Sequence, residues 1–255
     1  MSTHEKIANW LDNGRYADFP NSWDDKMFRT FILDRLTPET HLLDLGAGAG
    51  IVVEMNFRDH AARVCGVDPD PRVVDNPYLH EGREGFGESI PYEDESFEVV
   101  ISDNVFEHLD NPAEVITEIR RVLKPGGRLV AKTPNFWHYV ALGASITPHS
   151  FHRWFNAGRG RDAEDTFPTR YRANTRRDLT KLAKDTNMSL VSCEMIEGRP
   201  EYLRRWWPAY LLGAAYERIV NSTKLLEPFR CVLIAEFQKP AQSKTGTSPA
   251  ESLLP

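Results

Sequence analysis

The sequence predicts a three-layer α/β sandwich, and three stretches of the chain carry that prediction. The apolar run Leu42–Leu45, which contains Asp44, is followed at once by a turn with three glycines. Two further buried-strand patterns follow, Val64–Asp68 and the β-branched run Glu98–Ser102. Short apolar strands alternating with turns and helical spacing are typical of a central sheet that helices cover on both faces.

The glycine-rich turn predicts a ligand cradle. Gly46, Gly48 and Gly50 let the backbone adopt open φ/ψ values and come close to a ligand, and Ile51–Phe57 is expected to begin a helix. A dinucleotide fingerprint, Gly-x-Gly-x-x-Gly, would need a glycine where Ile51 stands. The turn therefore favours a nucleoside with a short polar chain over a pyrophosphate.

Polar residues stand at the ends of the next two predicted strands. Asp68 follows the glycine turn by about 20 residues, which fits one β-α-β unit, and its carboxylate can accept hydrogen bonds from both ribose hydroxyls. Asp103 and Asn104 come directly after Glu98–Ser102. Residues just past the carboxyl ends of parallel strands face the ligand crevice, so both are expected to border the cofactor or the acceptor. His108 is either a base there or a cap of local backbone.

Four segments together resemble the successive motifs of class I S-adenosylmethionine-dependent methyltransferases. They are Leu42–Gly50, Gly66–Asp70, Phe97–Ser102 and Leu123–Lys132, and the resemblance covers roughly residues 40–135. The branch that they resemble most is the small-molecule type similar to quinone-biosynthesis methyltransferases. The resemblance implies a Rossmann-like, mostly parallel seven-stranded sheet with its last strand antiparallel and a cap inserted after the fifth strand. It also implies S-adenosyl-L-methionine as the cofactor that donates the methyl group.

The resemblance further implies which residues hold this donor. Asp44 would order the glycine turn or meet the ammonium group of the donor. Aligned on Pro91, the position that usually carries an adenine-binding aspartate holds Phe86. Phe86 would then stack on the adenine, and the backbone of Gly87 or the side chain of Glu88 would contact its amine. The implied cofactor-binding residues are Asp44, Gly46, Ala47, Gly48, Gly50, Asp68, Pro69, Phe86, Gly87, Glu88, Asp103 and Asn104.

Residues 134–174 are expected to form a cap over the acceptor. They show no clear strand or long helix and are rich in aromatic residues, and residues 149–177 hold seven arginines against three acidic residues. Arginines there could hold a phosphate or carboxylate. Alternatively, the segment is a surface loop that its aromatic residues fasten. An oxygen acceptor with a high pKa needs a base, whereas a carbon or nitrogen acceptor can react without one. The candidate bases are His138, His149 and His152.

Composition narrows the class of protein. The 255 residues carry a net charge of −6, which disfavours nucleic-acid binding through a basic surface. The cysteines, Cys65, Cys193 and Cys231, lie far apart without metal-ligand spacing, so we expect a reducing cytoplasmic setting and no metal. Met1–Trp10 has no apolar core, so we expect no signal peptide there, and no run of the sequence reaches the roughly 20 apolar residues that span a bilayer. One domain is expected over residues 1–239, followed by a disordered tail at 240–255.

Residues 202–220 are expected to form a helix, and its sequence fits two locations. It could pack into the core with a kink at Pro208. It could instead lie on a membrane surface, because Arg204 and Arg205 adjoin two tryptophans.

The predicted function is methyl transfer from S-adenosylmethionine to a small-molecule, glycan or lipid-linked acceptor, for which a phosphate-bearing compound is a candidate. Two alternatives stay open. A nicotinamide-dependent oxidoreductase on a related fold is disfavoured by Ile51 in the glycine spacing. A non-catalytic domain could keep the fold and bind a partner, and Phe86 leaves room for it.

Overall fold

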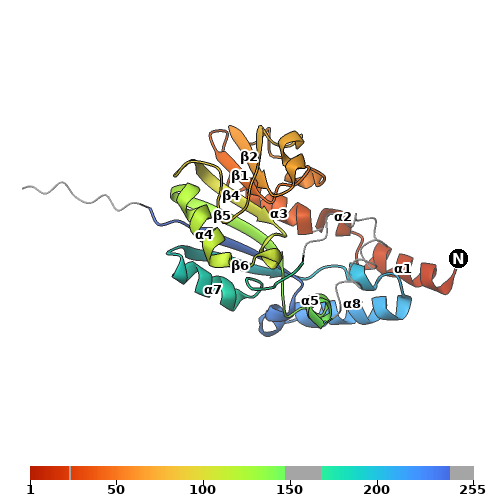
Figure 1. The fold of residues 1–255 in the computed structure, drawn as a ribbon. Coiled ribbons are helices and arrows are strands. Elements are labelled where there is room, and N and C mark those ends of the chain that lie inside the picture. The colour runs from red at the N-terminus through yellow and green to blue at the C-terminus, as the bar shows by residue number, and fades with distance from the viewer. Residues whose placement is uncertain (23, 147–167, 242–255) are drawn as a thin grey trace, which may run out of the picture.

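The computed structural model describes residues 1–22, 24–146 and 168–241. In this part of the chain a seven-stranded sheet forms the centre, with strand order β3-β2-β1-β4-β5-β7-β6 (Figure 1). All neighbouring pairs from β3 to β5 are parallel, whereas β7 runs antiparallel to both β5 and β6. This confirms the predicted mostly parallel sheet with an antiparallel last strand. The strands are β1 (His41–Leu45), β2 (Arg63–Asp68), β3 (Glu81–Glu84), β4 (Phe97–Asp103), β5 (Leu123–Pro134), β6 (Ser189–Ile196) and β7 (Val232–Gln238).

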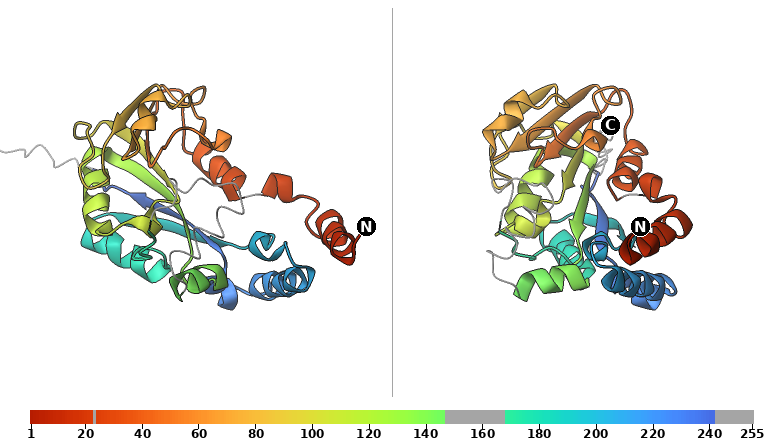
Figure 2. Two further views of the ribbon diagram at one scale, coloured as in Figure 1. Left: turned by 45° about the vertical axis from the view of Figure 1, so that its right-hand side comes forward. Right: turned by 90° about the vertical axis from the view of Figure 1, so that its right-hand side faces the viewer.

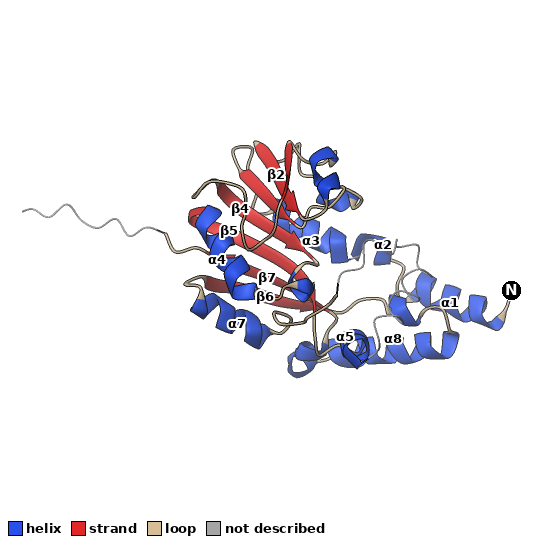
Figure 3. Ribbon diagram, viewed as in Figure 1, coloured by secondary structure: helices blue, strands red, loops and turns tan. Residues whose placement is uncertain are grey.

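Helices cover both faces of this sheet, as Figure 3 shows. Side chains alternate between the faces of a strand, so each strand supplies two cores. Leu43 of β1 packs in a cluster with Ile116 of α4 and Leu179 of α7, whereas its neighbour Leu42 packs with Phe28 of α3. The three-layer prediction is thus confirmed. The helices are α1 (Thr3–Gly14), α2 (Phe19–Ser22), α3 (Asp24–Leu33), α4 (Pro112–Val122), α5 (Tyr139–Ile146), α7 (Arg176–Asp185) and α8 (Trp207–Asn221).

One expectation about local structure is wrong, and one strand has no counterpart among those predicted. The helix expected at Ile51–Phe57 is only a 3-10 turn at Val53–Met55, because a run of β-branched residues follows the glycines and disfavours helix. Strand β3 lies in residues 76–89, where the sequence predicts no strand. This edge strand pairs with β2 through its backbone, and its side chains, Glu-Gly-Arg-Glu, show no apolar alternation that the sequence could reveal.

Helices α1 and α8 pack against each other and extend away from the sheet (Figures 1 and 2). Leu11, Tyr16 and Tyr210 form the apolar contact between them. Arg15 pairs with the buried Glu217 at 2.5 Å. Pro208 stands in the first turn of α8, so the predicted kink is absent and the proline instead begins the helix. None of the described helices has the length and hydropathy needed to cross a membrane.

Candidate functional site

A pocket of about 190 Å³ lies at the carboxyl edge of the sheet, where β1 and β4 are neighbours. The strand order reverses direction at this pair, and such points are where open α/β sheets bind ligands. The pocket is formed mainly by the loop after β1 and the end of β4. Its lining residues are Asp44, Gly46, Ala47, Gly48, Ala49, Gly50, Ile51, Val52, Met55, Asn76, Tyr78 and Asp103.

The glycine turn is held in a conformation that side chains would disturb. Gly46 and Gly50 have φ of +85° and +74°, and a Cβ on Gly50 would overlap the side chain of Asn76. The Asn76 amide donates hydrogen bonds to the carbonyl oxygens of Ala47 (3.0 Å) and Gly48 (3.1 Å). Asn76, which itself lines the pocket, therefore fixes the backbone of the turn.

Asp68 lies against the glycine turn and is not among the pocket-lining residues. Its Oδ2 accepts a hydrogen bond from the Gly48 amide (2.9 Å), and its Oδ1 accepts one from the Asp70 amide (2.8 Å). Burial raises the pKa of Asp68, and these two amides only partly oppose that rise. Each oxygen keeps a further lone pair, so the carboxylate can orient the loop and still accept a ligand hydroxyl. Pro69 follows it directly.

Asp44 is a buried acid that faces the pocket. Burial, and then the neighbouring carboxylates of Asp103 and Asp68, raise the pKa of Asp44 to about 8. No basic side chain pairs with it anywhere in the described ranges. A cationic group placed in the pocket would reverse this shift, because an opposite charge nearby favours the ionised acid.

Asp103, at the end of β4, belongs to a buried ionic cluster that the sequence did not reveal. Lys132 of β5 is fully buried, and its Nζ lies 3.0 Å from Asp103 Oδ1 and 3.3 Å from Asp24 Oδ2, with Asp25 also in contact. Burial raises the pKa of Asp103 to about 6, although Lys132 opposes the rise. Burial alone would lower the pKa of Lys132, but the three carboxylates outweigh it and raise that pKa. Asn104 donates its side-chain amide to Asp103 (2.8 Å).

The residues predicted to contact adenine lie outside the pocket lining. Phe86 forms an isolated β-bridge with Ser89, and its side chain is 64% exposed. Gly87 and Glu88 stand in the same turn. Phe86 is thus free to pack on a ligand, and its stacking role stays a prediction.

Of the three predicted histidine bases, the structure describes His138, which does not line the pocket. His138 is buried, burial lowers its pKa to about 4, and its Nε2 lies 3.4 Å from Glu197 Oε2. His149 and His152 lie outside the described residues. His108 Nδ1 donates to the carbonyl oxygen of Pro168 at 3.0 Å, which is a contact with a distant segment and not a cap of local backbone.

The two ends of the predicted cap meet beside the end of β4. The carbonyl oxygen of Glu107 accepts hydrogen bonds from the amides of Arg170 (2.6 Å) and Tyr171 (3.1 Å). The Phe136 amide donates to the carbonyl oxygen of Asn174 at 2.9 Å. Both ends of residues 134–174 are therefore anchored at the carboxyl edge of the sheet.

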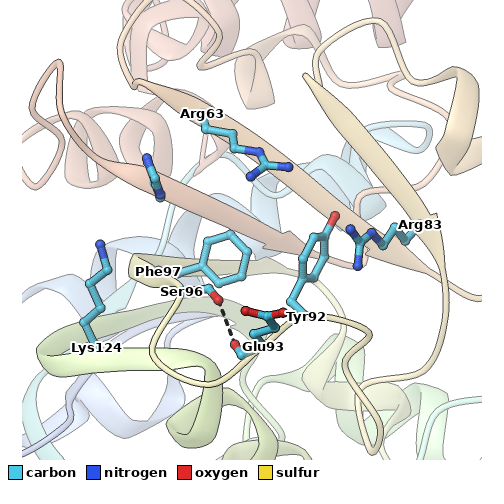
Figure 4. Close-up of a pocket in the computed structure, with 8 residues that line it drawn as sticks. Arg63, Arg83, Tyr92, Glu93, Ser96, Phe97 and Lys124 are labelled. Atoms are coloured by element: carbon cyan, nitrogen blue, oxygen red, sulfur yellow. Dashed lines mark hydrogen bonds between the residues drawn. The ribbon is translucent and has the colours of Figure 1, made fainter.

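A larger hollow of about 470 Å³ lies at the opposite edge, where the strands begin (Figure 4). Arg63 and Arg83 both pair there with Glu81, and Lys124 pairs with Glu98. Its basic side chains already have acidic partners, and ligands of parallel sheets bind at the other edge. The smaller pocket is therefore the candidate site.

Comparison with known proteins finds methyltransferases among the relatives of this chain. A family model described as a methyltransferase domain matches residues 43–131. An uncharacterized methyltransferase of Mycobacteroides abscessus is 27% identical over 201 residues, 72% of this chain and 74% of the relative. A ubiquinone biosynthesis O-methyltransferase of Cereibacter sphaeroides is 34% identical over 102 residues, 37% of this chain and 41% of the relative. This chain thus spans less than half the length of the Cereibacter protein.

Solved structures show the same fold at low sequence identity. A SAM-dependent methyltransferase from Methanosarcina mazei gives a TM-score of 0.53 at 17% identity, covering 83% of this chain and 98% of that one. The geranyl diphosphate C-methyltransferase of Streptomyces coelicolor A3(2), solved with Mg²⁺, geranyl diphosphate and S-adenosyl-L-homocysteine, gives 0.51 at 17% identity, covering 84% and 79%. With its strand order and its glycine turn, the chain has the fold of the S-adenosylmethionine-dependent methyltransferases, and its residues 43–131 match a methyltransferase domain.

Proposed function

We propose that this protein binds S-adenosyl-L-methionine in the pocket beside Asp44 and transfers its methyl group to a small-molecule, glycan or lipid-linked acceptor. The observation that carries the proposal is the buried acid itself. Asp44 faces a pocket walled by glycine backbone and has no basic partner in the described structure. The donor carries a sulfonium and an ammonium group, and either cation would stabilise the ionised form of Asp44.

The residues of the pocket fit the other parts of this donor. The glycine turn offers backbone amides at close range to a short amino-acid chain. Asp68 lies directly behind Gly48 and keeps lone pairs for ribose hydroxyls. The sulfonium supplies an activated methyl group, so the protein contributes mainly by positioning donor and acceptor. We propose the cytoplasm as the location of the protein, because its three cysteines are free thiols and the cytoplasm keeps thiols reduced.

For the acceptor, we propose a compound with an anionic group held by the cap. The arginine excess of residues 149–177 supports this charge preference. Arg170 and Arg172 bind Asp110, through its carboxylate and its backbone carbonyl. An anionic acceptor therefore needs arginines from the part of the cap outside the described residues, and Arg153 and Arg159 are our candidates.

Calorimetry with S-adenosylhomocysteine tests the donor site. Asp68→Ala removes both the bond that orients Gly48 and the predicted ribose contact. Hydrogen bonds to charged groups contribute about 1.5–3 kcal/mol each, so the affinity should fall at least about tenfold. Asp70→Ala is the matched control, because the carboxylate of that neighbouring acid pairs with Arg72, whereas the hydrogen bond to Gly48 belongs to Asp68. Equal dissociation constants for Asp68→Ala and the unmodified protein would reject the role of Asp68, and tight binding of NADH would favour the oxidoreductase alternative.

Phe86 gives a second test of donor recognition. Phe86→Ala should weaken binding of S-adenosylhomocysteine, since stacking of an aromatic side chain on a base contributes about 1–3 kcal/mol. The same calorimetric titration measures it. Phe86→Asp should weaken binding too. If that variant binds more tightly, the site needs a hydrogen bond to the adenine amine, and stacking by Phe86 is wrong.

A further inference from the structure

Helix α8 is apolar on both of its faces, although only one face is buried. Tyr210, Ala214 and Glu217 lie on the inner face, which packs against α1. Leu212 and Ile219 lie on the opposite face and are 71% and 58% exposed. Their spacing of seven residues, with the exposed Ala215 between them, places all three on one stripe. A water-exposed helix face normally carries polar or charged side chains, so this stripe requires an explanation.

The stripe lies among other exposed apolar side chains. Trp206 immediately precedes α8 and is mostly exposed, and so is Leu225 in the 3-10 helix Lys224–Phe229 that follows and packs on α8. Helix α5, which carries no charged residue, lies at the same lower end of the molecule as α8 in both Figure 1 and Figure 2. Clusters of exposed apolar side chains commonly mark an interaction surface.

Around α8, the acidic side chains are paired with basic ones, whereas several basic side chains have no acidic partner in the described structure. Every acidic residue of segment 201–229 has a basic partner: Glu201 with Arg199, Glu217 with Arg15, and Glu227 with Arg176. Arg205, Arg218 and Lys224 are exposed, and none forms an ion pair within the described ranges. The surface around the stripe therefore presents free positive charge, although the chain as a whole has a net charge of −6.

We propose that the outer face of α8 binds the surface of a membrane that contains anionic lipid. With 15 residues, α8 suits a helix that lies in the interface plane, with its apolar side chains among the acyl chains. Arg205, Arg218 and Lys224 would contact lipid headgroups, since juxtamembrane cations bind an anionic surface. An apolar stripe beside cations left unpaired in the described ranges fits an anionic membrane better than a second copy of this chain. In a symmetric dimer through this face, Arg205, Arg218 and Lys224 would lie opposite the same three cations of the other copy.

Vesicle co-sedimentation with the full chain tests the proposal. The protein should sediment with vesicles of phosphatidylcholine and phosphatidylglycerol, and much less with phosphatidylcholine alone or at high salt. Leu212→Glu and Ile219→Glu should each lower the bound fraction at least about tenfold, because a carboxylate would enter the apolar contact. Replacing Arg218 and Lys224 together by glutamine should reduce binding to the anionic vesicles only.

Val191→Glu is the control, because Val191 is an apolar residue with half of its surface exposed, but it stands on strand β6. It should sediment like the unmodified protein. All variants should keep their melting temperature and their affinity for S-adenosylhomocysteine, so loss of vesicle binding is separable from failure of the donor site. The proposal is overturned if the unmodified protein does not sediment with anionic vesicles, or if Leu212→Glu leaves sedimentation intact. A dimer that Leu212→Glu converts to a monomer, without vesicle binding, would assign the face to a second copy instead.

Discussion

Replacing Lys132 by methionine should lower the free energy of unfolding at pH 7 by about 3–5 kcal/mol. The Lys132 ammonium is fully buried and contacts Asp24, Asp25 and Asp103. Methionine fills similar space but leaves three neighbouring carboxylates without their cation. Chemical denaturation monitored by circular dichroism measures the loss.

Lys124→Met provides the control on the same strand. Lys124 pairs with Glu98, but both side chains are more than one-third exposed. Exposed pairs contribute about 0–1 kcal/mol, so this variant should unfold almost like the unmodified protein. Equal losses in the two variants would show that the buried cluster does not stabilise the fold. The Lys132→Met deficit should also shrink in acid, because protonation removes the repulsion among the three carboxylates.

Asp44→Asn should weaken binding of S-adenosylmethionine by roughly tenfold to a hundredfold and also stabilise the ligand-free protein above neutral pH. The first effect follows from loss of a charge-assisted contact of about 1.5–3 kcal/mol. The second follows from the pKa of Asp44, which burial raises from 3.8 to about 8. Between these values the folded state holds a proton that the unfolded state has released, so stability falls as pH rises. Asparagine cannot ionise and removes this loss.

Thermal denaturation at pH 5 and pH 8, with and without the donor, separates the two effects. Without ligand, Asp44→Asn should gain most over the unmodified protein at pH 8; with ligand, it should show the smaller rise in melting temperature. Asp59→Asn replaces an exposed acid and should change neither quantity. If Asp44→Asn binds the donor normally, Asp44 does not meet a cationic group and the proposed donor site fails.

Most of the fold could be predicted because its signals are local. The glycine turn, the buried strand before it and the strand that ends at Asp68 are each short unbroken patterns in the sequence. The structure brings the turn and Asp68 together at one edge of the sheet. Strand β3 was missed because an edge strand that pairs through its backbone needs no apolar alternation. Helix α8 stayed ambiguous in the sequence because apolar residues occur on both of its faces.

The candidate site was harder to predict where it depends on contacts between distant segments. In the sequence, Lys132 is a single polar residue within an apolar strand. Its partners Asp24 and Asp25 stand more than 100 positions earlier. No periodicity links them. The contacts of Asn76 with Ala47 and Gly48 in the glycine turn were missed for the same reason, since they join two loops.

The hydrogen bond between Phe136 and Asn174 has an evolutionary consequence. It joins the two ends of the cap to each other. The carbonyl oxygen of Glu107 separately binds the backbone of Arg170 and Tyr171 near the second end. A segment closed at its base can change length with little effect on the sheet, because each doubling of a flexible loop adds only about 0.6 kcal/mol of closure entropy. Under the proposed role of the cap in holding the acceptor, insertion or replacement between these two residues would change the acceptor and leave the donor site as it is.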